Sequence, residues 1–314
     1  MKLLPMGAKP RSQNRDLGHP FLWIFALLLL PSAANAQQHF RGDKALEITQ
    51  QFVAIGPRWC LSPGHAKAET FLRETFKHDQ LEEDTFTANT PIGPVPMRNF
   101  IVRFPGKKDG VIVLATHYET NYPLRNIGFV GANDGGSTTG LLIEIANEIR
   151  GKIRDGYSVW LVFFDGEEAI EHWQGTDNTY GSRHLAAKWG GDGTLKRVKA
   201  FVLADMLGDK DLDVMRETQS TPWLSNVVKQ AAQNTGHAKY FFAQSQAEED
   251  DHLPFLTRGV PSVDVIDADY GPHTQQTPDG YHHTAEDTMD KISAKSLTIA
   301  GDVFLETIKL VDRR

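Results

Sequence analysis

Three carboxylates follow one apolar run in LVFFDGEEAIEHW, the stretch at residues 161–173. The acids are Asp165, Glu167 and Glu168, and the run before them is typical of a buried strand. Like charges crowded at the end of such a strand repel one another unless a positive group lies between them. A divalent cation would offset that repulsion. Adjacent glutamates suit a metal site, because one can bind the ion while its neighbour accepts a proton.

Imidazole and carboxylate groups also follow other predicted strands and loops. They are His117 in THYET, Asp134 in FVGANDGG, Asp205 in VLADMLGD, and His282 and His283 in GYHHTAED. His, Asp and Glu bind zinc without the help of a thiolate. Because Cys60 is the single cysteine, an intrachain disulfide and a site built on several thiolates are both excluded. The residue types therefore predict a zinc-type site and leave open how many ions it holds.

The elements that must position these groups alternate between strands and helices. Continuous apolar runs occur in GVIVLATHY, YSVWLVFFD, KAFVLADM and PSVDVID, and such runs are typical of strands buried on both faces of a sheet. Helical periodicity occurs in GSTTGLLIEIANEIR, in PWLSNVVKQAAQN and in the last segment of the chain. The sequence therefore predicts an α/β fold, a three-layer α/β/α sandwich with a mostly parallel central mixed sheet. Ligands of such sheets bind beyond the carboxyl ends of the strands.

The first 36 residues are typical of a secretory signal peptide. A basic region precedes the apolar run FLWIFALLLL at residues 21–30, and PSAANA follows and ends at Ala36. A bilayer-spanning helix needs about 20 apolar residues, so we expect cleavage after Ala36 and a secreted or periplasmic protein. Residues 37–314 would then form a single domain that carries the candidate metal site. An uncleaved membrane anchor is the alternative.

The charge pattern bears on the partners of the chain. The formal net charge is −7, and the Lys and Arg residues are scattered without a basic block. This pattern gives no support to a nucleic-acid partner. We also expect no membrane association once the signal peptide is removed, and a monomer.

Motifs throughout the predicted mature chain resemble those of the animal-type zinc-dependent glutaminyl-peptide cyclotransferases. This family belongs to the zinc exopeptidase superfamily, which includes bacterial leucyl aminopeptidases. The motifs are SPGH, EEDTF, HYETNY, FVGANDGG, FFDGEEAIEHWQGTDNTYGSRHLA, LADMLGD, DDHLPFLTRGVPS and HHT. GEE is common to cyclases and peptidases, whereas the long stretch at residues 173–186 favours a cyclase. The resemblance implies conversion of the N-terminal glutamine of peptides or proteins to pyroglutamate, with release of ammonia.

The resemblance also implies a role for each matched residue. One zinc ion is expected to be held by Asp134, Glu168 and His283. Glu167 matches the catalytic acid/base of the family. Two further catalytic carboxylates, in a hydrogen-bonded network beside the metal, are expected to be Asp205 and Asp250. His117 is expected either to bind a second ion or to support the ligands of the first.

Departures from the family pattern concern the substrate pocket. Asp264 stands where a second histidine is expected, and His282 replaces a tryptophan before the ligand histidine. The loop DADYGPHTQQTPDGY is longer than the animal pattern. Trp173 matches a tryptophan at the pocket, and we expect His282 and Tyr270 to contact the substrate beside it.

Two other functions remain open at this stage. An aminopeptidase with two metal ions would use five ligands, which are His117, Asp134, Glu168, Asp205 and His283. All five are present, so the ligand types alone do not separate it from a cyclase with one zinc ion. A secreted binding domain without catalytic activity is the third candidate, because Asp264 and His282 depart from the family pattern.

Overall fold

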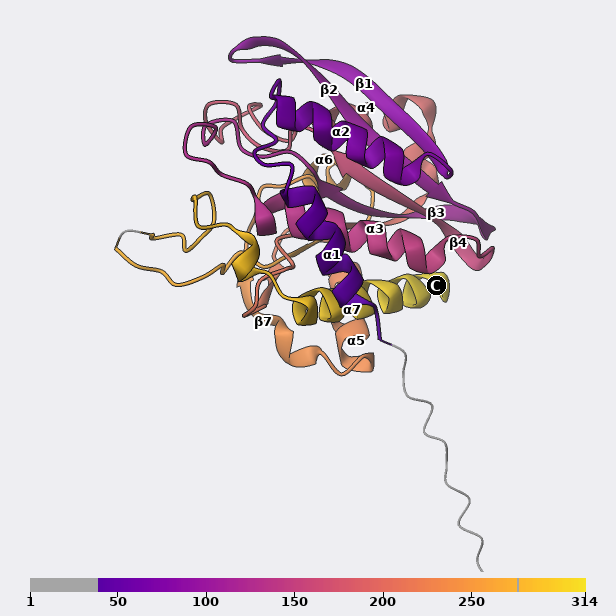
Figure 1. The fold of residues 1–314 in the computed structure, drawn as a ribbon. Helices are drawn as coiled ribbons and strands as arrows, with labels where there is room; N and C mark the ends of the chain where they lie inside the picture. The colour runs from indigo at the N-terminus through magenta and orange to yellow at the C-terminus, as the bar shows by residue number, and fades with distance from the viewer. Residues whose placement is uncertain (1–38, 276) are drawn as a thin grey trace, which may run out of the picture. The chain divides into compact units, whose positions relative to one another are not determined.

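The computed structural model describes residues 39–275 and 277–314, and within them eight strands form one sheet (Figure 1). The strands are β1 (Gln80–Thr90), β2 (Gly93–Phe104), β3 (Gly106–His117), β4 (Arg154–Phe164), β5 (Val198–Asp205), β6 (Val214–Glu217), β7 (Phe241–Gln246) and β8 (Ser262–Ile266). Their order across the sheet is β1-β2-β4-β3-β5-β8-β6-β7. Strands β4, β3, β5 and β8 are parallel neighbours, whereas β1, β2 and β6 introduce antiparallel pairs. The predicted mixed, mostly parallel sheet is confirmed.

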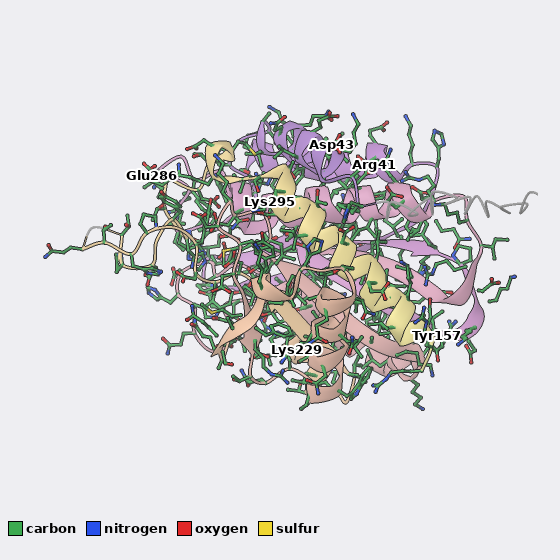
Figure 2. The ribbon with its side chains drawn as sticks, turned by 90° about the horizontal axis from the view of Figure 1, so that it is seen from below. Arg41, Asp43, Tyr157, Lys229, Glu286 and Lys295 are labelled. Atoms are coloured by element: carbon green, nitrogen blue, oxygen red, sulfur yellow. The ribbon has the colours of Figure 1, made fainter. Side chains whose placement is uncertain are left out.

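Helices cover both faces of this sheet. They are α1 (Gly42–Val53), α2 (Pro63–Phe76), α3 (Thr138–Ile149), α4 (Tyr180–Asp192), α5 (Pro222–Asn234), α6 (Leu253–Leu256) and α7 (Ala294–Asp312). Short helical turns are η1 (Ala132–Ser137), η2 (Thr194–Arg197), η3 (Ala238–Tyr240) and η4 (Met289–Lys291). Helices α1, α3 and α7 lie side by side on the near face in Figure 1. Arg41, the residue before α1 that is labelled in Figure 2, forms ion pairs with Glu144 and Glu148 of α3.

The apolar runs form the central strands because side chains on both faces are covered. Residues 110–117 of β3 are all buried. Leu114 packs in a core formed with α1, α2, α3, α5 and α7, whereas its neighbour Val113 packs in a second core with Trp189 of α4 and Phe255 of α6. Alternate side chains of one strand thus enter two different cores, as the period of a strand requires. The result is the predicted three-layer sandwich.

The sequence did not predict α4, β6 and β7. Helix α4 contains Gly190 and Gly191, and its sequence YGSRHLAAKWGGD lacks a clear apolar stripe. Strand β6 has only four residues, and β7 exposes four of its six residues at the edge of the sheet. Short and polar edge strands carry little of the hydrophobic pattern on which a prediction depends.

The described residues from His39 to Arg314 belong to one compact unit. None of the helices in this described part of the chain is long and apolar enough to cross a membrane. The predicted signal peptide at residues 1–36 lies outside the described residues. Its cleavage, and the domain boundary that follows from it, therefore stay predictions.

One of the three clustered carboxylates is used inside the fold. Asp165 is completely buried, and its Oδ1 lies 2.8 Å from Nε2 of His65 in α2. Its Oδ2 accepts a hydrogen bond of 2.8 Å from the backbone N–H of Arg98. The prediction that one cation compensates the charge of all three carboxylates is therefore wrong for Asp165. His65 and a backbone N–H already compensate this carboxylate.

Stability should depend on pH through this buried pair. Burial alone would lower the pKa of His65, but the Asp165 carboxylate outweighs it and raises the pKa to about 9. Since the unfolded pKa is about 6.5, the folded protein binds an extra proton between these pH values. The contribution of His65 to the free energy of unfolding should be complete below about pH 6.5 and fall by up to about 1.4 kcal/mol per pH unit above it.

Urea unfolding of the wild type and of His65→Gln between pH 6 and 10 measures this effect. We expect the wild-type advantage to shrink as the pH rises through this window. The exposed His78 provides the control, because His78→Gln should follow the wild-type curve. A constant difference between wild type and His65→Gln across the window would contradict the assignment.

Candidate active site

A cavity of about 660 Å³ lies where the carboxyl ends of the central strands and the loops after them converge. Glu167 and Glu168 follow β4, and Asp205 ends β5. The cavity brings together most of the residues that the sequence singled out, which are Asp134, Glu167, Glu168, Trp173, Asp205, Asp250, His282 and His283. Loops that are far apart in the chain therefore meet at one edge of the sheet, where parallel α/β folds bind their ligands.

A kinked turn holds Asp134 at the cavity. Asp134 lies in η1 with a non-helical φ of −75° and ψ of 101°. The backbone N–H groups of Asn133 and Asp134 donate to the carboxylate of Asp287, at 2.8 and 3.2 Å. The next residue, Gly135, has a φ of 72°, and a Cβ there would lie 2.9 Å from Cε1 of His117. A glycine is required at this point because both the backbone conformation and the nearby imidazole exclude a side chain.

His283 lies between two predicted metal ligands. Its Nε2 is 3.1 Å from Oε1 of Glu168 and 3.4 Å from Oδ2 of Asp134. The other oxygen of Glu168 accepts a hydrogen bond of 2.7 Å from Nδ2 of Asn121. Two donor atoms bound tetrahedrally to zinc at about 2.0–2.1 Å lie about 3.3 Å apart. The separations at His283 therefore fit neighbouring donors of one zinc ion.

Buried polar atoms around Asp134 also point to a cation. Oδ2 of Asp134, Oδ1 of Asp205 and both ring nitrogens of His117 make no hydrogen bond within the described part of the chain. Among the described residues, two groups of three side chains with donor atoms within 4.8 Å of one another contain Asp134: Asp134 with His282 and His283, and Asp134 with His117 and Asp205. The predicted ligand Glu168 is in neither group. Unpaired buried polar groups are costly, and an ion would satisfy them. The donor set suits zinc, and Asp134 is common to both groups.

Glu167 lies beside these ligands. Its side chain lines the cavity and is largely buried, and its Oε2 is 4.0 Å from Nδ1 of His117. Burial raises the pKa of Glu167 well above its ordinary value; His117 opposes the rise, and the charges of Asp250 and Glu168 add to it. A carboxyl group whose charged form is disfavoured is suited to take up and deliver a proton.

Asp205 and Asp250 also line the cavity, and His117 lies buried next to Asp205, outside the lining. Nε2 of His117 lies 3.0 Å from Oδ1 of Asp134 and 3.5 Å from Oδ1 of Asp205. Burial, followed by the charges of Asp205 and Asp251, raises the pKa of Asp250 well above its ordinary value. Carboxylates therefore face both ring nitrogens of His117, with Asp134 and Asp205 at Nε2 and Glu119 and Glu167 at Nδ1. This makes the imidazole a natural positive partner of these acids.

The residues expected to contact substrate lie in different places. Trp173 lines the cavity and is 39% exposed, and His282 lines it with its ring 3.8 Å from that of His283. Tyr270 is fully buried outside the cavity lining, and its hydroxyl donates to Oδ1 of Asp287 at 2.7 Å. Tyr270 therefore supports the residue that fixes the Asp134 turn, instead of forming the pocket wall.

Asp264, the other departure from the family pattern, also lies outside the cavity lining. It is completely buried in β8, with Oδ2 3.9 Å from Nδ1 of His252. Burial raises its pKa well above the ordinary value, and the charge of Asp250 adds to the rise. Asp264 is therefore not part of the cavity lining, but it is close enough to Asp250 for that charge to affect its pKa.

Sequence reasoning missed several residues that support the site. Asn121 binds Glu168, and a carboxylate oxygen of Glu119 accepts the backbone N–H of Glu168 at 3.1 Å. The fully buried Arg58 donates to the carbonyl groups of Val130 and Gly131, just before the Asp134 turn. Glu119 and Asn121 belong to the motif HYETNY, and Asp287 follows HHTAE. The closeness of these polar residues to His117 and His283 in the sequence is the signal that could have identified them.

Comparison with known proteins identifies the family. The model of peptidase family M28 matches residues 99–308. Glutaminyl-peptide cyclotransferase of Drosophila melanogaster is 30% identical over 226 residues, which are 63% of this chain and 63% of that protein. The match therefore spans less than two thirds of the length of this curated relative.

Solved structures give the same result. An Acidobacteriales bacterium glutaminyl cyclase is 63% identical with a TM-score of 0.87, over 90% of this chain and 98% of that one. Porphyromonas gingivalis glutaminyl cyclase is 28% identical with a TM-score of 0.76, over 86% and 98%. The resemblance to glutaminyl cyclases within the zinc exopeptidases is confirmed. Since the family model matches more than half of its residues, this chain belongs to peptidase family M28.

Proposed function

We propose that this chain is a zinc-dependent glutaminyl-peptide cyclotransferase, which converts N-terminal glutamine to pyroglutamate and releases ammonia. The observation that carries the proposal is the similarity to the Acidobacteriales glutaminyl cyclase, which extends over nearly the whole of that chain at 63% identity. The cavity supports it, because acids suited to metal binding and proton transfer lie together there.

The cavity suits the N-terminus of a peptide. Its volume of about 660 Å³ lies within the usual range of small-ligand sites. Acidic side chains dominate its polar lining, and besides the metal and proton-transfer residues they include Glu248, Glu249, Asp269 and Asp279. A wall of this sign attracts the positively charged α-amine of a peptide. Trp173, partly exposed at this lining, offers an aromatic surface to the residues that follow the glutamine.

Asp134, Glu168 and His283 would hold the zinc ion in this proposal. A bound zinc ion supplies Lewis-acid polarisation of a carbonyl group. Asn121 donates a hydrogen bond to the carboxylate of Glu168, and the carboxylate of Glu119 accepts one from the backbone N–H of Glu168. Such contacts fix the orientation of a ligand before the ion arrives.

Glu167 would move the proton that the reaction requires. The α-amine of the substrate attacks in its neutral form, after release of its extra proton to solvent. The attack is on the carbon of its own γ-carboxamide, so a C–N bond forms and closes a five-membered ring. The amine loses a proton to Glu167, and Glu167 returns it to the departing nitrogen as the original C–N bond breaks and ammonia leaves. Because both reacting groups belong to one molecule, the site mainly has to orient them.

Asp205 and Asp250 would hold the nitrogen atoms in place. Both line the cavity, and the charge of Asp205 is one cause of the raised pKa of Asp250. A pair that shares a proton can donate one hydrogen bond and accept another. Such a pair can hydrogen-bond to the α-amine while the amine loses its proton. It can also hydrogen-bond to the amide nitrogen while that nitrogen gains a proton.

An aminopeptidase with two ions is the second candidate function. The observation in its favour is the second donor group, in which His117 and Asp205 accompany Asp134. That group could hold a further ion with Asp134 between the two. The two functions differ in the bond that breaks, because a peptidase frees the N-terminal residue whereas a cyclase frees ammonia.

Removal of the proton-transfer group tests the mechanism. In Glu167→Gln, we expect kcat to fall by about 10²–10⁴-fold, with the catalytic zinc still bound, because Gln keeps the shape of Glu but cannot cycle a proton. The matched control is Glu171→Gln on the same loop, where the side chain is exposed, and it should retain wild-type activity. Wild-type turnover by Glu167→Gln would show that another group transfers the proton.

Product analysis tests the reaction type. The protein is incubated with the β-naphthylamides of glutamine and of leucine, and both ammonia and free naphthylamine are measured. We expect ammonia from the glutamine compound with its naphthylamide bond intact, and no naphthylamine from the leucine compound. Release of naphthylamine from leucine would instead establish an aminopeptidase.

A further inference from the structure

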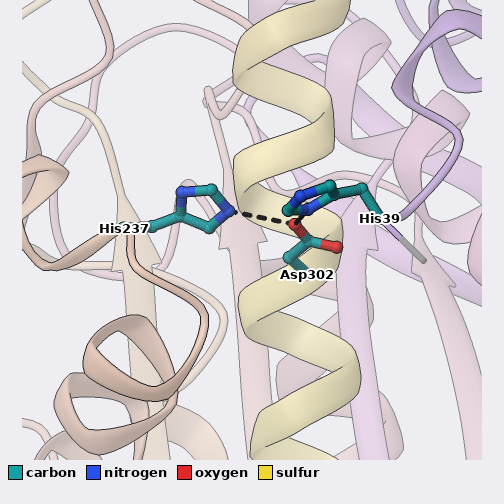
Figure 3. A group of neighbouring side chains, drawn as sticks. All are labelled: His39, His237 and Asp302. Atoms are coloured by element: carbon teal, nitrogen blue, oxygen red, sulfur yellow. Dashed lines mark hydrogen bonds and ion pairs between the residues drawn. The ribbon is translucent and has the colours of Figure 1, made fainter. Parts of the chain in front are cut away.

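Two histidines and an aspartate lie together outside the cavity, where the first described residues meet the C-terminal helix (Figure 3). His39 precedes α1, His237 follows α5, and Asp302 lies within α7. Each offers one donor atom, and the three atoms all lie within 4.8 Å of one another. We propose that His39, His237 and Asp302 form a second binding site for a zinc-type divalent cation, independent of the proposed catalytic function.

Asp302 is the centre of this group. Its Oδ2 lies 2.6 Å from Nδ1 of His39 and 2.9 Å from Nε2 of His237 (Figure 3). Its other oxygen, Oδ1, accepts a hydrogen bond of 2.7 Å from the backbone N–H of Phe40. The carboxylate is therefore oriented by one oxygen, while the second oxygen faces both imidazoles. Outer contacts of this kind orient metal ligands in known sites.

The donor set is the one that zinc prefers. Two imidazole nitrogens and one carboxylate oxygen match His and Asp ligation, and water can supply the fourth position of a tetrahedron. The side chain of Asp302 is only 6% exposed, and in the described part of the chain its ion-pair partners are the imidazoles of His39 and His237, with no lysine or arginine among them. A dication would therefore neutralise a largely buried carboxylate that lysine and arginine do not reach.

The group can accept an ion with a small movement. Ligand atoms on a tetrahedral zinc lie about 3.3 Å apart, so the two N–O separations must lengthen by about 0.4–0.7 Å. His39 can supply the movement, because its side chain is 54% exposed. The same exposure leaves room for entry of the ion and for a bound water.

Binding here would hold His39 and Phe40 against α7. Phe40 is buried against α7, where a Cβ on Gly301 would lie 2.1 Å from the Phe40 ring. The three ligands are 263 and 65 residues apart along the chain, so the unfolded protein does not hold them together. An ion that binds only the folded state raises its stability.

A second site also changes how metal content is interpreted. A cyclase with one catalytic zinc would bind two ions per chain, which is also the total for a peptidase with two ions in its active site if this group binds none. Total zinc therefore does not separate the two functions unless this group has been removed.

Zinc binding by matched variants tests the proposal. Wild type, His39→Gln and the exposed control His78→Gln are freed of metal with a chelator, titrated with Zn²⁺, passed through a desalting column and analysed for bound zinc. We expect wild type and His78→Gln to retain one more zinc ion per chain than His39→Gln. Zinc should also raise the melting temperature of wild type more than that of His39→Gln.

A second variant removes the charge at the centre of the group. Asp302→Asn keeps an oxygen for the N–H of Phe40 and should also lack the additional ion. Equal zinc content and equal rises in melting temperature for wild type, His39→Gln and Asp302→Asn would overturn the proposal and leave a hydrogen-bonded group alone. Turnover of an N-terminal glutamine peptide is measured in parallel. Its absence in wild type would contradict the cyclase proposal without removing the difference in zinc content.

Discussion

Compensation of buried negative charge is the constraint on which the rest of this structure depends. Asp134, Glu167, Glu168, Asp205 and Asp250 line one cavity at the edge of the sheet. Burial disfavours the charged form of a carboxylate, and like charges nearby add to the cost. The protein opposes that cost with His117 and His283, and with groups of imidazole and carboxylate donors around Asp134 that suit zinc. Without such compensation the five acids would have to take up protons or move apart.

The surrounding elements hold the acids in this costly arrangement. A chain of contacts runs from the Tyr270 hydroxyl to Asp287 and on to the backbone of the Asp134 turn. Arg58 binds carbonyl groups just before that turn, and Gly135 lets it approach His117 closely. Rigid central strands place the loops, and polar contacts set their final orientation. Such support is what keeps ligands and proton-transfer groups in position.

The sequence predicted the fold and the site well where a buried strand is followed closely by side chains that can bind a metal ion or transfer a proton. Runs such as GVIVLATHY mark strands that are covered on both faces, and the acids and imidazoles after them meet at the cavity. It was less informative where the pattern is weak or a contact is distant. The polar edge strand β7 and helix α4 carry no clear period, and β6 has only four residues. Nothing near Asp165 in the sequence shows that His65, 100 residues away, pairs with it. The burial of Tyr270 against Asp287 likewise depends on the path of a long loop.

The central claim is that one cation is held by Asp134, Glu168 and His283, with Glu167 beside it. Anomalous X-ray diffraction at the zinc absorption edge, from crystals of the zinc-loaded protein, tests this claim most directly. The account predicts a peak in the cavity within about 2.0–2.2 Å of one atom of each of the three ligands, with both oxygens of Glu167 outside bonding distance. A cavity without a peak, or an ion bound by Glu167, would contradict it.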